Sequence, residues 1–531
     1  MYLPNNGYAV LASLAALLGT VYFASRIIYN IYFHPLSKYP GPLLHRATRL
    51  AYVYHLISGK LPLAVYRIHR EYGPVVRIAP DELSFTDPEA WKDIYGPKPG
   101  LPPGSEAAEL PKSRMFYRSD GLPPSIVTIE GRANHAILRR QLGHGFSERA
   151  LRDQEPIIGG YTDLLIRRLR EHAVDSKPKP ESKRLKLNPL DMTAWFNWTT
   201  FDIIGDLAFG EPFGCLDEAK YDPWVTAING TLRLSSYFFA AKHLGLQMLL
   251  RPLLVLFGRG RREHRKHTQQ KLRRRMEGDP ERPDLIQGLL KNKDAWNNQI
   301  ERLQVNAGTL IVAGSETTAT ILTGATYLLL RNPAALKRLT AEVRSAFQTD
   351  DEITFAAVSN LPYLLACLNE SLRRYPPVTL GMPRVAPKGG VIIVGEFVPE
   401  GTTVAVWQWP INHDPMHWTD PFGFHPERFL PRDDNDDSNT KADFSHDRLD
   451  ALQPFLVGPR NCIGRNLAYA EMRLILAKLV FHFDMQLAGP GEDVDNEGDG
   501  KRGKEDWMED QKSDILWRKT PLYVYLEPVA R

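Results

Sequence analysis

The chain has 531 residues, of which 43% are hydrophobic and 24% charged, and 66 basic against 62 acidic residues give a net charge of +4. This is the composition of a folded protein, and it does not support a nucleic-acid binder, which usually carries a concentrated basic excess. The three cysteines, Cys215, Cys367 and Cys462, are widely spaced without a CxxC pair. The sequence therefore argues against a disulfide framework or a zinc site and suits a reducing compartment.

An uncharged apolar run is the first element along the chain. Tyr8–Ser25 reads YAVLASLAALLGTVYFAS and, as a helix, would extend roughly 27 Å, close to the thickness of a bilayer core. A cleaved signal peptide is the alternative, but the run lacks a basic n-region and is long for an h-region. Basic residues follow the run, so the positive-inside rule places the body in the cytosol. We expect residues 1–33 to form a single-pass membrane anchor that spans the bilayer at about residues 8–25.

The rest of the chain predicts a hinge and one large body that is mainly α with a minor β region. Residues 34–42 (HPLSKYPGP) form the stiff Pro-rich hinge, and residues 43–531 form the body. Residues 74–80 and 83–87 predict a β-hairpin, residues 96–125 a long loop, and residues 391–406 a second strand region with a hairpin turn at Pro399–Gly401. Helical periodicity predicts long helices around 132–174, 190–210, 222–257, 300–331, 333–347 and 361–375.

Three polar segments interrupt this pattern. Residues 431–450 and 489–506 predict solvated loops. Residues 259–275 are strongly basic, which fits either a solvated helix face or a contact with anionic lipid or an acidic partner. The sequence has no GxxxxGK[ST] phosphate loop, no GxGxxG that follows a predicted strand, no HExxH and no GxSxG. This argues against a nucleoside triphosphatase, a dinucleotide-binding dehydrogenase, a zinc protease and an α/β-hydrolase.

The stretch FLVGPRNCIG, Phe455 to Gly464, places a cysteine immediately before a predicted helix. Buried filler, a nucleophile and a metal ligand are the three possible roles. The helix N-terminus favours a thiolate, and the two glycines would bring the backbone close to something flat or bulky. Phe455 offers an aromatic surface, and Arg460 a partner for a carboxylate. A thiolate ligand beneath a carboxylated haem uses all these features, whereas a nucleophile needs a nearby base, which this segment lacks.

These residues resemble the haem-ligand loop of the cytochrome P-450 family, FxxGxRxCxG, at every fixed position. The resemblance covers essentially the whole chain and is greatest to membrane-anchored fungal members that act in secondary metabolism. It implies the cytochrome P-450 fold, haem b as the cofactor, and Cys462 as the ligand of the haem iron. The haem-binding residues that it implies are Phe455, Gly458, Arg460, Cys462 and Gly464.

Further segments match the same family. AGSETT, from Ala313 to Thr318, lies in a long apolar helix, where threonines also back-bond to their own turn. A glycine, an acid and two threonines are nevertheless poor choices for plain packing. By resemblance, Thr317 would hydrogen-bond the oxygen that is activated and Glu316 would help relay protons to it. In HAILRR, the family's Trp-x-x-x-Arg is replaced by His135 and Arg139, which with Arg384 would contact the haem propionates. An exposed helical histidine is the alternative for His135.

Two motifs predict bracing of the haem loop. Glu370 and Arg373 of ESLR are three residues apart and share one helix face. Such pairs are usually surface decoration, but the arginine of PERF, Arg428, joins the pair in the family. We expect the three to form a buried structural network. Cys215 and Cys367 match no family ligand and are interpreted as small buried hydrophobes.

The resemblance implies a haem-thiolate monooxygenase, an O2-dependent oxidoreductase that oxidises a small apolar metabolite, in a catalytic body on the cytosolic side of the endoplasmic reticulum membrane. Its partners would be an NADPH-dependent reductase, membrane lipid, substrate and O2, and no nucleic acid. The alternatives are a haem-thiolate isomerase or dehydratase that needs no O2, and a non-catalytic haem-binding protein. The apolar stretch 235–258 is expected to dip into the membrane. The expected substrate-pocket residues are Phe116, Ile126, Val127, Leu310, Ala313, Val378 and Leu380.

Overall fold

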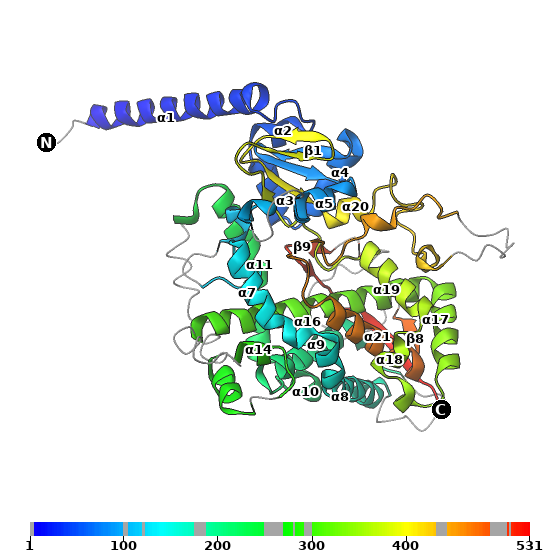
Figure 1. Cartoon of the computed structure of the whole chain (residues 1–531). Coiled ribbons are helices and arrows are strands. Elements are labelled where there is room, and N and C mark those ends of the chain that lie inside the picture. The colour runs from blue at the N-terminus through cyan, green and yellow to red at the C-terminus, as the bar shows by residue number, and fades with distance from the viewer. Residues whose placement is uncertain are drawn as a thin grey trace.

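The structure is a computed structural model that describes residues 5–98, 105–118, 123–174, 187–248, 269–279, 282–290, 300–431, 443–488, 507–508 and 511–530. Within these residues the protein is mainly helical with small sheets, which confirms the predicted fold class. Long helices fill the centre of the body, and the largest sheet lies at the end from which the N-terminal helix projects (Figure 1).

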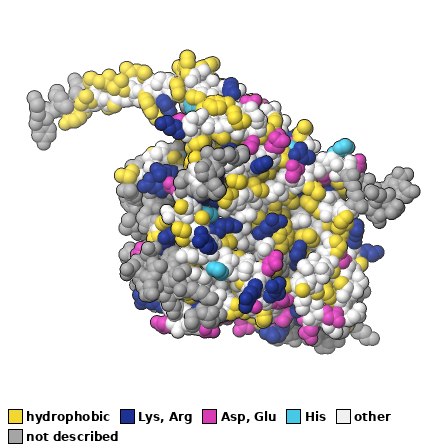
Figure 2. Space-filling view, viewed as in Figure 1, with side chains coloured by type: hydrophobic (Ala, Val, Ile, Leu, Met, Phe, Trp, Pro, Cys, Tyr) yellow, Lys and Arg dark blue, Asp and Glu magenta, His cyan; other side chains and the backbone are white. Residues whose placement is uncertain are grey.

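The N-terminal helix α1 (Asn5–Ile28) continues through a π-helical turn, η1 (Tyr29–Phe33). Residues Tyr8–Phe33 form one helical segment that is long and apolar enough to cross a membrane. Figures 1 and 2 show it extending away from the body, with hydrophobic side chains along its length. The helix thus continues eight residues beyond the predicted end of the span.

The Pro-rich hinge lies against the body and is no free spacer. Leu36 is fully buried, and the hydroxyl of Tyr39 donates a 2.8 Å hydrogen bond to the carbonyl of Phe397. The buried guanidinium of Arg77 donates to the carbonyls of Asn30 and Leu36. These contacts fix the direction in which the chain leaves α1.

The main sheet has the strand order β1–β2–β7–β4. Strands β1 (Val75–Ala79) and β2 (Glu82–Phe85) pair antiparallel, as the predicted hairpin requires, and β7 (Thr403–Val406) joins β2 in parallel. Within the second strand region the prediction was wrong about the turn. The hairpin joins β5 (Val391–Ile393) to β6 (Glu396–Val398), through Val394 and Gly395, which both have positive φ. Residues Pro399–Gly401 instead lead from β6 into the main sheet.

The helical core surrounds α16 (Ile300–Arg331), which lies along α9 (Met192–Phe209). Gly314 permits this packing, because a Cβ on it would lie 2.6 Å from the side chain of Ile204 on α9. The glycine of AGSETT is therefore a packing residue. The other long helices that match the prediction are α17 (Pro333–Ala346), α19 (Pro362–Arg374) and α21 (Arg465–His482).

Three predicted segments differ from the structure. The pattern over 132–174 is divided into α7 (Arg132–Gly143), η3 (His144–Phe146) and α8 (Glu148–Ala173), and Ser147 caps α8. Helix α11 (Pro223–His243) ends earlier than predicted, while residues 249–257 lie outside the described ranges. The expected loop 96–125 contains η2 (Glu106–Ala108) and α6 (Arg114–Tyr117).

The structure describes parts of two of the three predicted polar segments. Of the basic run it describes residues 269–275, which are helical, and of the first loop it describes residues 431 and 443–450. The second loop, residues 489–506, lies outside the described ranges. The remaining elements are α2 (Leu43–Ala47), α3 (Leu50–Ile57), α4 (Leu61–Tyr72), α5 (Glu89–Tyr95), α10 (Cys215–Glu218), α14 (Gln287–Leu290), α18 (Phe355–Val358), α20 (Gln408–Asn412), η4 (Asp350–Glu352), η5 (Pro426–Phe429), η6 (Leu449–Ala451), β3 (Leu190–Asp191), β4 (Arg384–Val385), β8 (Phe483–Leu487), β9 (Lys512–Ser513), β10 (Trp517–Arg518) and β11 (Tyr523–Pro528).

Candidate functional site

The loop before α21 holds Cys462 in a fixed position. The backbone N–H of Cys462 donates a 2.9 Å hydrogen bond to the carbonyl of Phe455, which closes the loop. Gly458 has a φ of 78°, and a Cβ on it would lie 2.1 Å from the carbonyl oxygen of Tyr95. Gly458 therefore lets the loop pack closely against the end of α5.

The thiol of Cys462 is accessible although protein surrounds it. Its side chain is exposed, yet burial by the surrounding protein raises the pKa of the thiol. The N–H of Gly464 and the charge of Arg139 act in the opposite direction and are outweighed. The protein alone thus favours the neutral thiol, contrary to the expectation from the helix N-terminus. A bound metal cation would deprotonate it, as cations do to coordinated thiols.

Two further residues of the loop pattern are Gly464 and Phe455. A Cβ on Gly464 would lie 3.9 Å from the Cys462 sulfur, so Gly464 lies directly beside the thiol. The ring of Phe455 packs on Tyr469 of α21, with 5.3 Å between ring centroids. The aromatic ring therefore supports the loop from the side of α21.

Arg139 ties α7 to the cysteine loop. Its guanidinium donates two 2.6 Å hydrogen bonds, to the carbonyl and to the side-chain Oδ1 of Asn461. Asn461 directly precedes Cys462, so Arg139 holds the cysteine loop in position. His135, one turn earlier, is buried and not an exposed helical histidine. Burial and then the positive charges of Arg460, Lys112, Arg139 and Arg384 lower the pKa of His135 to about 3, so its imidazole is neutral at pH 7.

Arg460 has a carboxylate partner within the protein. Its Nε donates to Glu109 at 2.6 Å, and its two terminal nitrogens donate to the carbonyls of Ile129 and Glu130. Arg132 also pairs with Glu109, at 3.3 Å. Arg460 thus joins the cysteine loop to the segment before α7, and its contact with a cofactor carboxylate stays a prediction.

Arg384 is the buried cation whose surroundings fit an anionic ligand. It is 4% exposed, donates to the carbonyl of Leu110 at 3.3 Å, and its Nε has no hydrogen-bond partner. Unpaired buried charges are unfavourable unless a counter-charge is present. An accessible thiol together with this orphaned guanidinium fits a haem, which offers an iron to the one and carboxylates to the other.

On α16, Ala313 and Thr317 form an accessible strip within a helix that is otherwise largely buried. The hydroxyl of Thr317 donates a 2.6 Å hydrogen bond to the carbonyl of Ala313. It remains able to accept a hydrogen bond from, or exchange a proton with, a group in the space that the strip borders.

Glu316 points to another side of α16 and is held in an ion pair. Its Oε2 lies 2.8 Å from the ammonium of Lys519, and both side chains are buried. Lys519 also donates to Asn197 of α9 and to Thr320. The second oxygen of Glu316, Oε1, is buried without a hydrogen-bond partner. Glu316 must therefore change rotamer or partner before it can pass a proton towards Thr317.

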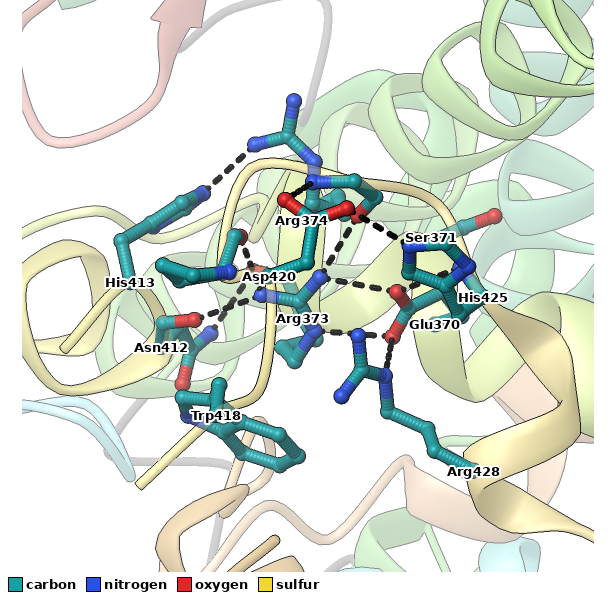
Figure 3. A network of polar contacts seen from close by, with 12 residues as sticks. Glu370, Ser371, Arg373, Arg374, Asn412, His413, Trp418, Asp420, His425 and Arg428 are labelled. Carbon is teal, nitrogen blue, oxygen red and sulfur yellow. Dashed lines mark hydrogen bonds and ion pairs between the residues drawn. The ribbon is translucent and has the colours of Figure 1, made fainter. Parts of the chain in front are cut away.

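Glu370, Arg373 and Arg428 lie together in a buried network (Figure 3). Arg373 binds both oxygens of Glu370 at 2.8 Å, and Arg428 Nε lies 3.2 Å from Glu370 Oε2. The network extends to backbone: Arg373 donates to the carbonyls of Asn412, Pro421 and Gly423, and Glu370 accepts from the N–H of His425. Arg428 is further paired with Asp447. The network thus joins α19 to the chain that leads to the cysteine loop.

The residues expected to line a substrate pocket are distributed over several clusters. Ile126 and Leu310 belong to the main hydrophobic core. Phe116 stacks on Phe239 of α11, with 5.3 Å between centroids, and Leu380 packs in a cluster that includes this region of α11. The other members have different placements: Val378 forms a bridge with Leu516, Val127 is exposed, and Ala313 lies on the accessible strip of α16.

Sequence reasoning missed several partners of the predicted residues. Lys519 pairs with Glu316 across 203 positions, Glu109 with Arg460 across 351, and Asn461 with Arg139 across 322. Phe239 and Leu516 likewise join the expected pocket residues from distant segments. A single sequence gives no local signal for such pairs, apart from the adjacency of Asn461 to the cysteine.

Comparisons with known proteins agree with this geometry. A protein-family profile described as Cytochrome P450 matches residues 40–501. The chain is 49% identical to Cytochrome P450 monooxygenase tpeC of Talaromyces stipitatus over 98% of this chain and 95% of that protein. It is 44% identical to Cytochrome P450 monooxygenase prhB of Penicillium brasilianum (95% and 96% covered). Its identity to Averantin hydroxylase of Dothistroma septosporum is 39% (98% and 93% covered).

Proposed function

Since the chain belongs to the cytochrome P450 family, we propose that it is a haem b-dependent enzyme that oxidises a small apolar metabolite with electrons from an NADPH-dependent reductase. The chain is a monooxygenase, an O2-dependent oxidoreductase like its named relatives. One observation carries the rest of the proposal. Cys462 presents an accessible but desolvated thiol at the head of α21, on a loop that Arg139 and Arg460 fix to the rest of the body.

The haem, when bound, supplies the activation of O2 and the transfer of one oxygen atom to the substrate. Cys462 would hold the iron as a thiolate and donate electron density to it. Arg384 would bind a haem carboxylate. Thr317 would orient oxygen by hydrogen bonding, and Glu316 would deliver protons after release from Lys519, because splitting the O–O bond needs protons in a dry site.

Thr317→Ala tests the proton-delivery role. We expect product formed per NADPH consumed to fall on the order of 10²-fold, in the range of a lost acid–base contribution, while hydrogen peroxide release rises. The matched control is Thr326→Ala, because Thr326 makes the same bond to the carbonyl four residues earlier but is fully buried. Equal coupling in Thr317→Ala and the wild type would remove Thr317 from the mechanism.

The reaction type is tested with ¹⁸O2. We expect a product that carries one ¹⁸O atom when the purified chain is incubated with reductase, NADPH and a metabolite extract of the organism that encodes it. Product that forms equally well without O2 and NADPH would instead identify an isomerase or dehydratase.

The proposed substrate class rests on the relatives and on the residues around the site. The relatives include a protein named averantin hydroxylase, and the expected pocket residues are apolar. We place the substrate among small apolar secondary metabolites. The reductase is expected to dock near Cys462, where the exposed side chains of Arg140 and Arg465 flank the cysteine loop and offer charge to an acidic partner.

We further propose that the body lies on the endoplasmic reticulum membrane beside α1. Besides α1, apolar side chains are exposed on α2 and α3 and at the end of α11, and α3 packs against α11. They are Leu43, Leu44, Leu50, Tyr54, Leu244, Leu246 and Met248. Exposed apolar side chains on neighbouring elements are typical of membrane contact.

This membrane contact gives a further prediction. In a chain that lacks residues 1–33, the triple change of Leu244, Leu246 and Met248 to serine should reduce vesicle binding about tenfold or more, since each removed side chain lowers the apolar area buried in lipid. Serine at Ile137 and Leu449, which are also exposed but lie on α7 and η6, is the control. Unchanged vesicle binding and unchanged substrate uptake in the triple variant would contradict the membrane contact.

A further inference from the structure

Asn306 is a fully buried amide on α16 that the roles described so far do not use. Its Oδ1 accepts a 2.9 Å hydrogen bond from the backbone N–H of Ile126, and its Nδ2 donates to the carbonyl of Arg302 at 2.8 Å. Because one end of the amide accepts and the other donates, its orientation is fixed. A polar side chain in the core is unfavourable unless it satisfies another buried polar group. Asn306 does this for Ile126, which is 180 positions away in the chain.

Ile126 lies in a turn, residues 125–129, that is closed by its own hydrogen bonds. The N–H of Ser125 donates to the hydroxyl of Thr128 at 2.8 Å, and the N–H groups of Thr128 and Ile129 donate to the carbonyl of Ser125 at 3.1 and 2.9 Å. Such bonds define the backbone shape of a turn. The contact with Asn306 therefore positions the turn 125–129 as a unit.

The turn 125–129 connects two parts of the candidate site. On one side, Asn306 attaches it to α16, the helix that carries the accessible strip. On the other side, Arg460 of the cysteine loop donates to the carbonyls of Ile129 and Glu130 at 2.8 and 2.6 Å. The turn is thus a strut between the helix and the loop, and its position is fixed relative to both.

We propose that Asn306 is a positioning residue that determines substrate specificity, because it holds the turn 125–129 as one wall of the substrate space. The inference rests on the proposed haem-dependent function and names a residue that no motif indicated. Without this contact, the N–H of Ile126 has no acceptor among the described residues, and the turn adopts several positions. A ligand that packs against the turn then binds more weakly, since only the fraction of the protein with an anchored turn accepts it.

Two azoles of different size measure the shape of the substrate space in the haem-loaded full chain. Imidazole nitrogens bind iron, so the shift of the Soret band reports binding. Imidazole itself is small, whereas the phenyl ring of N-phenylimidazole extends into the substrate space. Asn306→Leu should bind N-phenylimidazole about tenfold more weakly than the wild type and imidazole within about twofold of it.

A second variant loosens the turn without changing α16. Thr128→Val removes the acceptor of the Ser125 N–H and should also weaken the binding of N-phenylimidazole but not of imidazole. The test therefore does not depend on the stability of Asn306→Leu. The control is Thr323→Val, because Thr323 is also fully buried on α16 and donates to the carbonyl of Ala319 in the same helix. This variant should bind both azoles as the wild type does.

Amide hydrogen exchange provides a readout that needs no added ligand. In Asn306→Leu, the N–H of Ile126 should exchange about ten- to a hundredfold faster than in the wild type, because its hydrogen bond is lost. Thr323→Val should leave the exchange of residues 123–130 unchanged.

The results separate the role of Asn306 from the proposed function. If haem-loaded Asn306→Leu and Thr128→Val bind both azoles with wild-type affinity, the role of Asn306 is overturned. Equal weakening of both azoles would also overturn it, because that result indicates a general loss of the haem site. A purified wild-type chain that binds no haem would overturn the proposed function and this inference with it.

Discussion

Replacement of Cys462 by alanine is expected to abolish substrate oxidation. The chain has three cysteines, and Cys462 is the one with an exposed side chain. Alanine removes the sulfur that would hold the iron and donate electron density to it, and no neighbouring side chain in the described loop offers another thiolate. In the ¹⁸O2 assay, product formation by Cys462→Ala should fall to the background measured without enzyme.

The other two cysteines are the controls for this prediction. Cys215 and Cys367 are buried, and burial raises the pKa of both thiols. Alanine at either position should lower stability by roughly 1 kcal/mol, as small core truncations do, and leave turnover per folded molecule within about twofold. Oxidation that survives in Cys462→Ala, or disappears in Cys215→Ala while the protein stays folded, would contradict the assignment.

Arg373→Leu should give the second large effect, on folding and haem content. Arg373 and Glu370 are both fully buried, and Arg373 makes five hydrogen bonds at 2.6–2.9 Å. Leucine would leave three backbone carbonyls without this donor. Among the described residues, Glu370 would keep one ion-pair partner, Arg428. Breaking a buried pair in this way costs about 3–5 kcal/mol, a large part of the 5–15 kcal/mol typical of a folded domain.

Urea unfolding and haem content measure this effect. The control is Arg338→Leu, because Arg338 pairs with Glu427 at 3.2 Å but is half exposed, and such a pair contributes about 0–1 kcal/mol. Arg373→Leu should lose most of its bound haem and unfold at lower urea, whereas Arg338→Leu should resemble the wild type. Equal unfolding midpoints for the two variants would show that the network does not brace the haem loop.

Local patterns predicted most of the helices because their apolar period is long and regular. The span of α16, for example, matches its prediction at both ends. Failures occurred where contacts between distant segments decide the local structure. The hairpin turn lies at Val394–Gly395, because β7 is recruited by β2 and β4. Contacts with distant segments also explain why glycine is needed at positions 314 and 458. A Cβ on Gly314 would meet the side chain of Ile204, and a Cβ on Gly458 would meet the carbonyl of Tyr95.

In the candidate site, too, local patterns indicated the motif residues but not the partners that come from distant segments. The motifs brought Cys462, Thr317 and the Glu370–Arg373 pair to attention, because each lies in a short, dense pattern. The partners that set their electrostatics come from elsewhere in the chain: Lys519 for Glu316 and Glu109 for Arg460. These pairs depend on the fold and could not be read from the sequence alone.

The central claim is that Cys462 is the thiolate ligand of a haem. The absorption spectrum of the reduced, CO-bound protein tests it most directly. We predict a thiolate-shifted Soret band in the wild type, in Cys215→Ala and in Cys367→Ala, and its disappearance in Cys462→Ala. A wild-type spectrum without haem absorption, or a shifted band that persists in Cys462→Ala, would contradict the account.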